Sequence, residues 1–72
     1  MARAVDLKRV LAKNVRRLRK AAGLSQSALA IDAGQHQHVI SMIENAKVDV
    51  RVGTVAKIAA ALGVHPRDLF EE

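Results

Sequence analysis

Apolar residues recur along most of the chain at steps of three and four, the spacing that aligns side chains on one face of an α-helix. The pattern predicts a first helix over residues 7–22, a second of about two turns after residue 25, a third that ends near residues 45–46, and a fourth over 52–62. The positions that define these helices are Leu7, Val10, Leu11, Val15, Leu18, Leu29, Ala30, Ala33, Val39, Ile40, Ile43, Val52, Val55, Ile58, Ala59 and Leu62. Because no segment alternates as a half-buried strand does, the pattern predicts an all-α protein.

Residue types at the ends of these segments support the same boundaries. Asp6 and Ser25 carry side-chain oxygens that cap a helix N-terminus. Gly23 and Gly63 suit the position just beyond a helix end, where φ is positive. The loop over residues 47–51 separates the third helix from the fourth.

The last predicted element is a very short fifth helix. His65 takes the cap position and Pro66 the first helical position, where its missing N–H costs nothing. Leu69 and Phe70 are expected to dock this turn onto the core. Five helices joined by short connections indicate an all-α compact bundle. We expect one domain over residues 1–72, with its core at about 7–70.

The chemistry changes between the second and third helices. Gly34 allows a sharp change of direction, and four hydrogen-bonding side chains follow it, namely Gln35, His36, Gln37 and His38. Such a tetrad contributes no apolar contact to a core. It is typical of a surface that recognises base edges in DNA, where amide and imidazole groups form hydrogen bonds.

Length and composition limit the class of protein. A chain of 72 residues is near the lower limit for folding without covalent or metal support, so a partner subunit is plausible. The absence of Cys excludes disulfides and thiolate zinc sites, and nothing indicates secretion. No apolar run approaches the roughly 20 residues of a membrane span. We therefore expect a cytoplasmic protein.

The net charge of +5 is unevenly distributed. Residues 1–23 hold eight of the twelve Lys and Arg residues and a single acid, Asp6. The eight are Arg3, Lys8, Arg9, Lys13, Arg16, Arg17, Arg19 and Lys20. A concentrated basic surface suits a polyanion, because each phosphate contact releases counterions. A solvated helix face is the alternative.

Three blocks of sequence occur in a characteristic order and spacing. They are VRRLR (15–19) before GLSQ (23–26); Leu29-Ala30 with Gly34 and ISMIE (40–44); and TVAKIAAALGV (54–64) followed by DLF (68–70). Over about residues 10–70 the chain thus resembles the Cro/repressor-type (Xre-like) helix-turn-helix family, which includes the phage lambda repressor domain. The resemblance implies a lambda-repressor-like fold in which the second and third helices form the helix-turn-helix. It also implies a sequence-specific DNA-binding transcriptional regulator.

The resemblance implies roles for the matching positions that hold the DNA backbone. Ser25 and Gln26 open the second helix, whose N-terminal amides point at the same phosphate that the family's glutamine holds. Arg16 on the first helix is a further expected phosphate contact. Lys47 and Arg51, in the loop after the third helix, are expected to contact phosphates or to remain solvated.

The resemblance also places His36, Gln37, His38 and Met42 toward the major groove. Gln37 carries the most specific chemistry, because a glutamine amide forms a bidentate pair with N7 and N6–H of adenine. His38 can donate to guanine O6 or N7, whereas His36 can contact a phosphate. The Met42 thioether either touches a thymine methyl or packs at the helix edge. Gln35 is expected to belong to the turn.

Arg19 and Glu44 match the family pair that ties the first helix to the recognition helix through a salt bridge. Other positions depart from the family pattern. Ala28 lacks the carboxylate of a reciprocal cap. Ala46 replaces a frequent glycine, so the third helix is expected to end without a positive-φ residue. Arg51 is a weak cap for the fourth helix.

Catalysis and other classes of function find less support. His36 and His38 are two positions apart, which on a helix points them about 200° apart, and no Cys or carboxylate cluster completes a metal set. No nucleophile elbow or Gly-rich phosphate loop is present, so we expect no enzyme, cofactor, metal or small-molecule ligand. A basic membrane-surface helix is disfavoured because the apolar stripe of residues 7–18 lacks Trp and Phe.

The main alternative is an antitoxin-type or other protein-interaction module that also binds DNA. Such proteins usually carry an extra segment, and none is visible before the chain ends at Glu72. The leading hypothesis is a homodimer that binds double-stranded DNA at a near-palindromic operator, with its two third helices in successive major grooves. The dimer candidates, from the family's C-terminal helices, are Val64, Leu69 and Phe70; the alternative is that all three close the core of the monomer. The length resembles that of the small controller proteins of restriction–modification systems.

Overall fold

A computed structural model describes residues 4–72 of the chain, so Arg3 of the basic segment lies outside the described residues. The elements are α1 (Leu7–Ala21), α2 (Gln26–Ala33), α3 (Gln37–Glu44), α4 (Val52–Leu62) and the 3₁₀ helix η1 (Pro66–Phe70). The all-α class is confirmed, but the described residues contain four α-helices rather than five. The fifth element is a 3₁₀ helix of only five residues. His65 and Asp68 form a capping box at its start, and five residues are too few for an extended run of α-helical hydrogen bonds.

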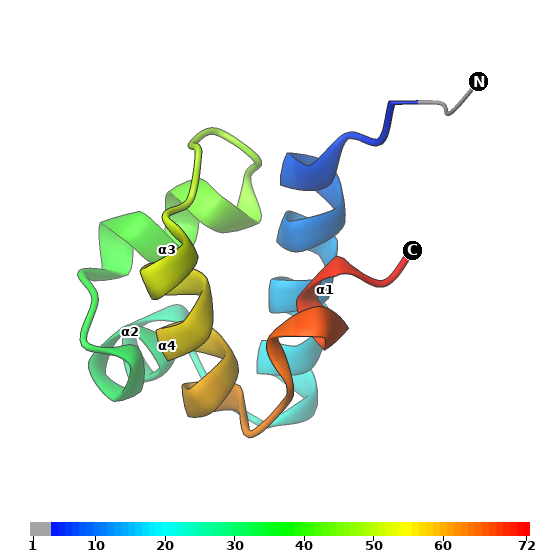
Figure 1. Cartoon of the computed structure of the whole chain (residues 1–72). Helices are drawn as coiled ribbons and strands as arrows, with labels where there is room; N and C mark the ends of the chain where they lie inside the picture. The colour runs from blue at the N-terminus through cyan, green and yellow to red at the C-terminus, as the bar shows by residue number, and fades with distance from the viewer. Residues whose placement is uncertain (1–3) are drawn as a thin grey trace.

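The α-helices surround one core. Figure 1 shows α2 and α3 together on one side of the molecule and α1 on the other, with α4 in front between them. α1 packs against α3 and η1, while α2 packs against α3 and α4. The second and third helices are thus held from behind by two other helices, which leaves one surface of this pair free.

The predicted caps of the first two helices are present. Asp6 Oδ1 accepts a hydrogen bond from the Arg9 N–H at 3.3 Å, and Ser25 Oγ accepts one from the Ala28 N–H at 3.0 Å. Between α2 and α3, Gly34 adopts φ of 64°, the left-handed conformation that turns the chain. Asp6 thus defines the start of α1, and Ser25 and Gly34 define the start of α2 and the turn between α2 and α3.

The end of α3 differs from the prediction. Ala46 has φ of 56°, so the helix does end with a positive-φ residue although no glycine is present. The Lys47 N–H donates to the Met42 carbonyl at 2.9 Å, and the Ala46 N–H donates to the Ile43 carbonyl at 3.0 Å. These two bonds form a Schellman motif, which requires the left-handed conformation whatever the side chain. The expectation from residue type was therefore wrong.

The core follows the predicted apolar faces except at Leu7, Val10, Val52 and Phe70: Val10 is partly buried outside the core cluster, and Phe70, expected to dock onto the core, is exposed. Its buried members are Leu11, Val15, Leu29, Ala30, Ala33, Ile40, Ile43, Val55, Ile58, Ala59 and Leu69, and the partly buried Val39 packs against them. Leu7 and Val52, at the first turns of their helices, are instead 54% and 85% exposed. Helical periodicity aligned them with the core, but both lie in the first turn of their helices, where they line an apolar groove.

Asn14 is a buried polar residue that the sequence pattern did not reveal. Its Nδ2 donates to the carbonyl oxygens of Leu69 at 3.0 Å and Glu71 at 2.8 Å. Its Oδ1 accepts from Arg17 at 3.3 Å. A buried amide with all these partners stabilises the fold instead of opposing it, and it fixes the C-terminal segment to α1.

The Glu44 carboxylate joins three helices. Arg19 on α1 donates to it through Nε at 2.6 Å and Nη2 at 2.9 Å, a two-point contact that confirms the predicted pair. Gln26 on α2 donates to Oε1 at 3.1 Å. Arg16 Nε lies 3.5 Å from the same oxygen. The last residue of α3 is thereby bound to α1 and to the first turn of α2.

Burial and pairing act in opposite directions on this carboxylate. Its side chain is fully inaccessible to solvent, and burial by itself raises the pKa of Glu44. Hydrogen bonds from Arg19 and Gln26, together with the Arg19 charge, outweigh that effect and hold the pKa below its ordinary value. The hydrogen bond to Glu44 likewise raises the pKa of Arg19. Both groups are therefore charged at neutral pH.

No helix among residues 4–72 combines the length and the apolar character that crossing a membrane requires.

The left-handed Ala46 generates a stability prediction. Ala46→Gly should raise the free energy of unfolding by about 1 kcal/mol, because the left-handed conformation costs an L-residue about 1–2 kcal/mol and the greater freedom of glycine in the unfolded chain offsets part of that gain. Urea denaturation measures the change. The matched control, Ala60→Gly at an exposed helical site in α4, should lower stability by about 1 kcal/mol. A loss of stability in both variants would contradict the explanation.

The cluster that Glu44 forms with Arg16, Arg19 and Gln26 generates a second stability prediction. Glu44→Gln should lower the free energy of unfolding by about 3 kcal/mol at pH 7, since removing one partner of a buried pair leaves the other charge uncompensated. Because the pKa of Glu44 is lowered by folding, its stabilisation is complete above the unfolded pKa, about 4–5, and is lost as the pH falls through the folded pKa.

The measurement is urea denaturation between pH 7 and pH 3. The variant should lose less stability over this range than the wild type does, because one depressed carboxyl pKa has been removed. Asp32→Asn, at an exposed position on α2, is the matched control and should keep the wild-type pH profile. Identical profiles for the wild type and Glu44→Gln would contradict the role assigned to the cluster.

Candidate nucleic-acid interface

The start of α3 presents the residues predicted to contact bases. His36 is the N-cap residue, with extended backbone and no side-chain capping bond, and Gln37 is the first residue of the helix. His36, Gln37 and His38 are all exposed, whereas Met42, one turn further along, is partly buried. Three polar side chains thus extend from the helix tip, and Met42 lies at the edge of the surface they form.

The other face of α3 explains why its tip can be so polar. Ile40 and Ile43 are fully buried in the core, and Glu44 holds the end of the helix through Arg19. The helix is therefore positioned by contacts behind and beyond its exposed tip. The polar tip needs no apolar anchor of its own.

Gln35 belongs to the turn, as predicted. Its backbone N–H donates to the Ala30 carbonyl at 2.8 Å, and its side-chain Nε2 donates to the Ala33 carbonyl at 3.3 Å. The tetrad therefore divides at Gln35: this side chain is tied back to α2, and the next three extend from α3.

The start of α2 carries the predicted phosphate-binding residues Ser25 and Gln26. The first-turn N–H groups of an α-helix have no carbonyl partner within it and carry the positive end of the helix dipole. Gln26 donates one of its two amide hydrogens to Glu44, which the sequence did not predict. The second hydrogen remains available, so the bond to Glu44 orients the amide without using all of its capacity.

Arg16, on α1, lies next to the start of α2. Its Nε and the amide nitrogen of Gln26 both lie near one oxygen, Glu44 Oε1, so the two groups are close neighbours. A cation, an amide donor and a helix N-terminus therefore come together, although Arg16 is ten residues distant from Gln26 along the chain. Donors of these three kinds suit a phosphate oxygen.

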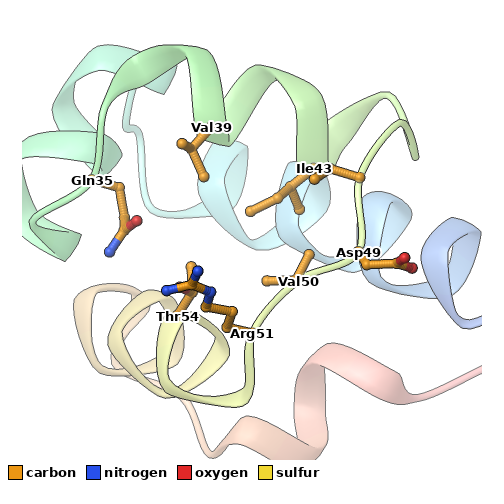
Figure 2. Close-up of a pocket in the computed structure, with 8 residues that line it drawn as sticks. Gln35, Val39, Ile43, Asp49, Val50, Arg51 and Thr54 are labelled. Carbon is orange, nitrogen blue, oxygen red and sulfur yellow. The ribbon is translucent and has the colours of Figure 1, made fainter.

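The loop after α3 contains the last two predicted phosphate contacts. Lys47 and Arg51 are both exposed. Figure 2 shows the Arg51 guanidinium turned into a pocket together with Gln35 and Thr54, while Asp49 points out of it. Asp49 lies instead 3.2 Å from Lys8 on α1. Arg51 thus stands between the turn before α3 and the first turn of α4.

The dimer candidates occupy different surroundings. Leu69 is fully buried within the core, Val64 is partly buried against it, and Phe70 is 37% exposed. The Leu69 side chain closes the monomer and has no surface to offer a partner. Among residues 4–72, no group of three or more His, Asp or Glu side chains is arranged to hold a metal ion.

Comparison with known proteins agrees with this geometry. A helix-turn-helix family model matches residues 15–69. Control protein C.BamHI from Bacillus amyloliquefaciens is 33% identical over 67 residues, which cover 92% of this chain and 83% of that protein. A hypothetical transcription factor from Neisseria meningitidis is 39% identical over 59 residues, 82% of this chain. That match spans only 56% of the Neisseria protein.

A solved structure shows the same arrangement. The restriction–modification controller protein C.AhdI from Aeromonas hydrophila superposes with a TM-score of 0.85 at 33% sequence identity, over 88% of this chain and 96% of that one. Similarity at this level extends to the order and packing of the helices, not to the motif alone. Together with the family match, it shows that the chain belongs to the Cro/repressor-type (Xre-like) helix-turn-helix family of DNA-binding transcription regulators.

Proposed function

We propose that the chain is a sequence-specific transcriptional regulator that binds a near-palindromic operator as a homodimer, with α3 in the major groove of each half-site. The observation that carries the proposal is α3 itself, which buries Ile40 and Ile43 while its polar tip stays exposed. A helix fixed from behind with hydrogen-bonding groups at its N-terminal end has the form that enters a major groove.

Within this complex the exposed side chains divide between bases and backbone. Gln37 and His38 contact base edges, His36 lies at the tip, and Met42 borders the base surface. Ser25, Gln26 and Arg16 hold a phosphate at the start of α2, while Lys47 and Arg51 hold the backbone on the other side of α3. Base contacts supply the specificity, and phosphate contacts fix the register.

The relatives support a controller-type regulator. One similar protein is named a control protein and another is described as a restriction–modification controller. We infer that residues 1–72 act as one helix-turn-helix domain with double-stranded DNA as its partner, in the cytoplasm and without a cofactor. Non-enzymatic function accords with these regulator relatives.

The dimer surface that we propose is an apolar groove. Its lining comes from the first turns of α1 and α4, the loop between α3 and α4, and the end of η1, and it includes Leu7, Leu11, Val48, Val50, Val52, Val55 and Phe70. Three of these, Leu7, Val52 and Phe70, are among the large apolar side chains that the described surface exposes. An apolar surface of this kind is unsuited to DNA and marks a protein contact.

A second copy is the partner that matches this groove. A two-fold interface brings the same patch of each subunit together, so the patch must complement itself. Lys8 and Asp49 stand at the rim 3.2 Å apart, one of each sign, and a two-fold axis can place each opposite its counterpart. The groove adjoins the loop after α3, at the opposite end of that helix from His36, so pairing leaves both recognition tips free.

Selection of bound DNA from a random pool at a fixed salt concentration tests base recognition. Gln37→Ala should remove the preference at one position of each half-site, at a cost of about 1–3 kcal/mol, while non-specific binding persists. Gln35→Ala makes the same chemical change in the turn and should leave the selected sequence unaltered. An identical consensus for the wild type and Gln37→Ala would refute the base contact.

Sedimentation equilibrium tests the groove. Val52→Lys should raise the dimer dissociation constant at least about tenfold, the equivalent of roughly 1.4 kcal/mol, because it places a charge in the apolar contact. Monomer stability should hardly change, since Val52 is 85% exposed. Ile31→Lys is the matched control: Ile31 is 76% exposed on α2, away from the groove, and the variant should dimerise normally. Equal dimerisation of both variants would exclude this surface.

A further inference from the structure

Four cations form a continuous stripe on the outer face of α1. Lys13, Arg16, Arg17 and Lys20 occur at steps of three and four, so they share a face opposite the buried Leu11 and Val15. All four are exposed, and α1 contains no acidic residue. We call these four residues the α1 cation stripe. They border an open hollow of about 410 Å³ that also includes Ala12 and Glu44.

Pairing within the protein leaves most of this charge uncompensated. Glu44 is the one acid at the hollow, and both of its oxygens already accept from Arg19. Arg16 alone of the stripe approaches it, at 3.5 Å. Arg17 donates to the neutral Asn14 amide. Among the described residues, no ion pair includes Lys13, Arg17 or Lys20. The stripe therefore offers at least three free positive charges on one helix face.

The stripe is continuous with the phosphate site at the start of α2. Arg16 belongs to both, because its Nε and the Gln26 amide meet at Glu44 Oε1. From Lys13 to Lys20 the stripe extends about 10 Å along α1, the axial length of about three base pairs. A DNA strand held at α2 thus has a run of cations beside it of a length that suits several phosphates.

The direction of the stripe indicates which part of the DNA it meets. The proposed dimer groove includes Leu7 and Leu11 at the beginning of α1, and the stripe lies further along the same helix toward its C-terminal end. The stripe therefore extends away from the groove, beginning two residues after Leu11 and leading toward the start of α2. In the proposed dimer this direction leads away from the two-fold axis, so DNA that reaches the Lys20 end of the stripe lies toward the outer side of the half-site.

From these observations we propose that the α1 cation stripe binds backbone phosphates of the DNA that flanks each operator half-site on its outer side. The inference rests on the proposed function and adds to it a sequence-independent contact beyond the operator. The stripe lengthens the DNA footprint and increases affinity and salt dependence without altering which bases are preferred, since phosphate contacts carry no sequence information.

The test compares two DNA lengths and two double variants. One duplex contains only the selected operator and the other adds six or more base pairs, about half a helical turn, at each end. Lys13→Gln/Lys20→Gln removes two stripe charges, and Lys57→Gln/Arg67→Gln removes two exposed charges elsewhere. Circular dichroism melting checks that both variants fold. The dissociation constant is measured from about 50 to 200 mM salt, the range over which phosphate contacts dominate the change.

On the extended duplex, the stripe variant should bind at least about tenfold more weakly than the wild type at the lowest salt. The slope of log affinity against log salt should fall in magnitude by about 2, close to one unit for each phosphate that the variant no longer neutralises. On the operator-only duplex the stripe and control variants should behave alike. The control should resemble the wild type, apart from a small general charge effect, on both duplexes.

Different outcomes overturn different claims. If the wild type selects an operator but the two double variants bind the extended duplex equally weakly, or the stripe variant is weakened as much on the short one, the flank contact is refuted while the proposed function stands. If the slope of log affinity against log salt is the same for the stripe variant and the wild type on both duplexes, the flank contact is also refuted. An acidic protein surface is then the partner that fits the stripe. If the wild type selects no sequence, the proposed function fails, and the flank contact fails with it.

Discussion

The recognition surface depends on one buried negative charge. The Glu44 carboxylate has no access to water, so it must be fully paired within the protein, and the donors that pair it come from α1 and α2. This requirement limits how the three helices can be arranged: a shift of any one separates a donor from the carboxylate and leaves a buried charge with its desolvation cost uncompensated. Apolar packing of Ile40 and Ile43 tolerates small displacements, whereas the two-point contact with Arg19 at 2.6 and 2.9 Å does not.

The same carboxylate links the two regions that we propose to face DNA. Gln26 and Arg16 meet it at one oxygen, next to the start of α2, while its own backbone ends α3. The distance between the proposed phosphate site and the polar tip of α3 is therefore set by an internal ion cluster. This explains why a protein this small can hold a polar helix tip in a defined orientation: the tip contributes nothing to the core, and its position is determined by the other end of the helix.

How far the sequence predicted the molecule depended on whether a feature was local. The four α-helices, the caps at Asp6 and Ser25 and the turn at Gly34 follow from residues adjacent in sequence, and the Arg19–Glu44 pair followed from family resemblance. The contacts of Asn14 and the bond from Gln26 to Glu44 could not be predicted, because each needs groups at least 18 residues away to converge. The exposure of Val52 was missed because periodicity assigns a face to a residue but does not show how much of that face other elements cover. Ala46 was missed because two backbone bonds, not its side chain, determine its φ.

The three surfaces of the molecule differ in a way that separates their tasks. Hydrogen-bonding amide and imidazole groups gather at the tip of α3, cations along α1 and at the loop after α3, and exposed apolar groups at the groove of Leu7, Val52 and Phe70. Hydrogen-bonding groups discriminate between bases, cations hold a backbone whatever its sequence, and apolar groups are suited to neither and favour another protein. Because the groove and the tip lie at opposite ends of α3, a partner subunit at one does not compete with DNA at the other. The proposed dimer doubles the number of base contacts, and a surface on which Gln37, His38 and the partly buried Met42 are the proposed base contacts needs this in order to select one site among many.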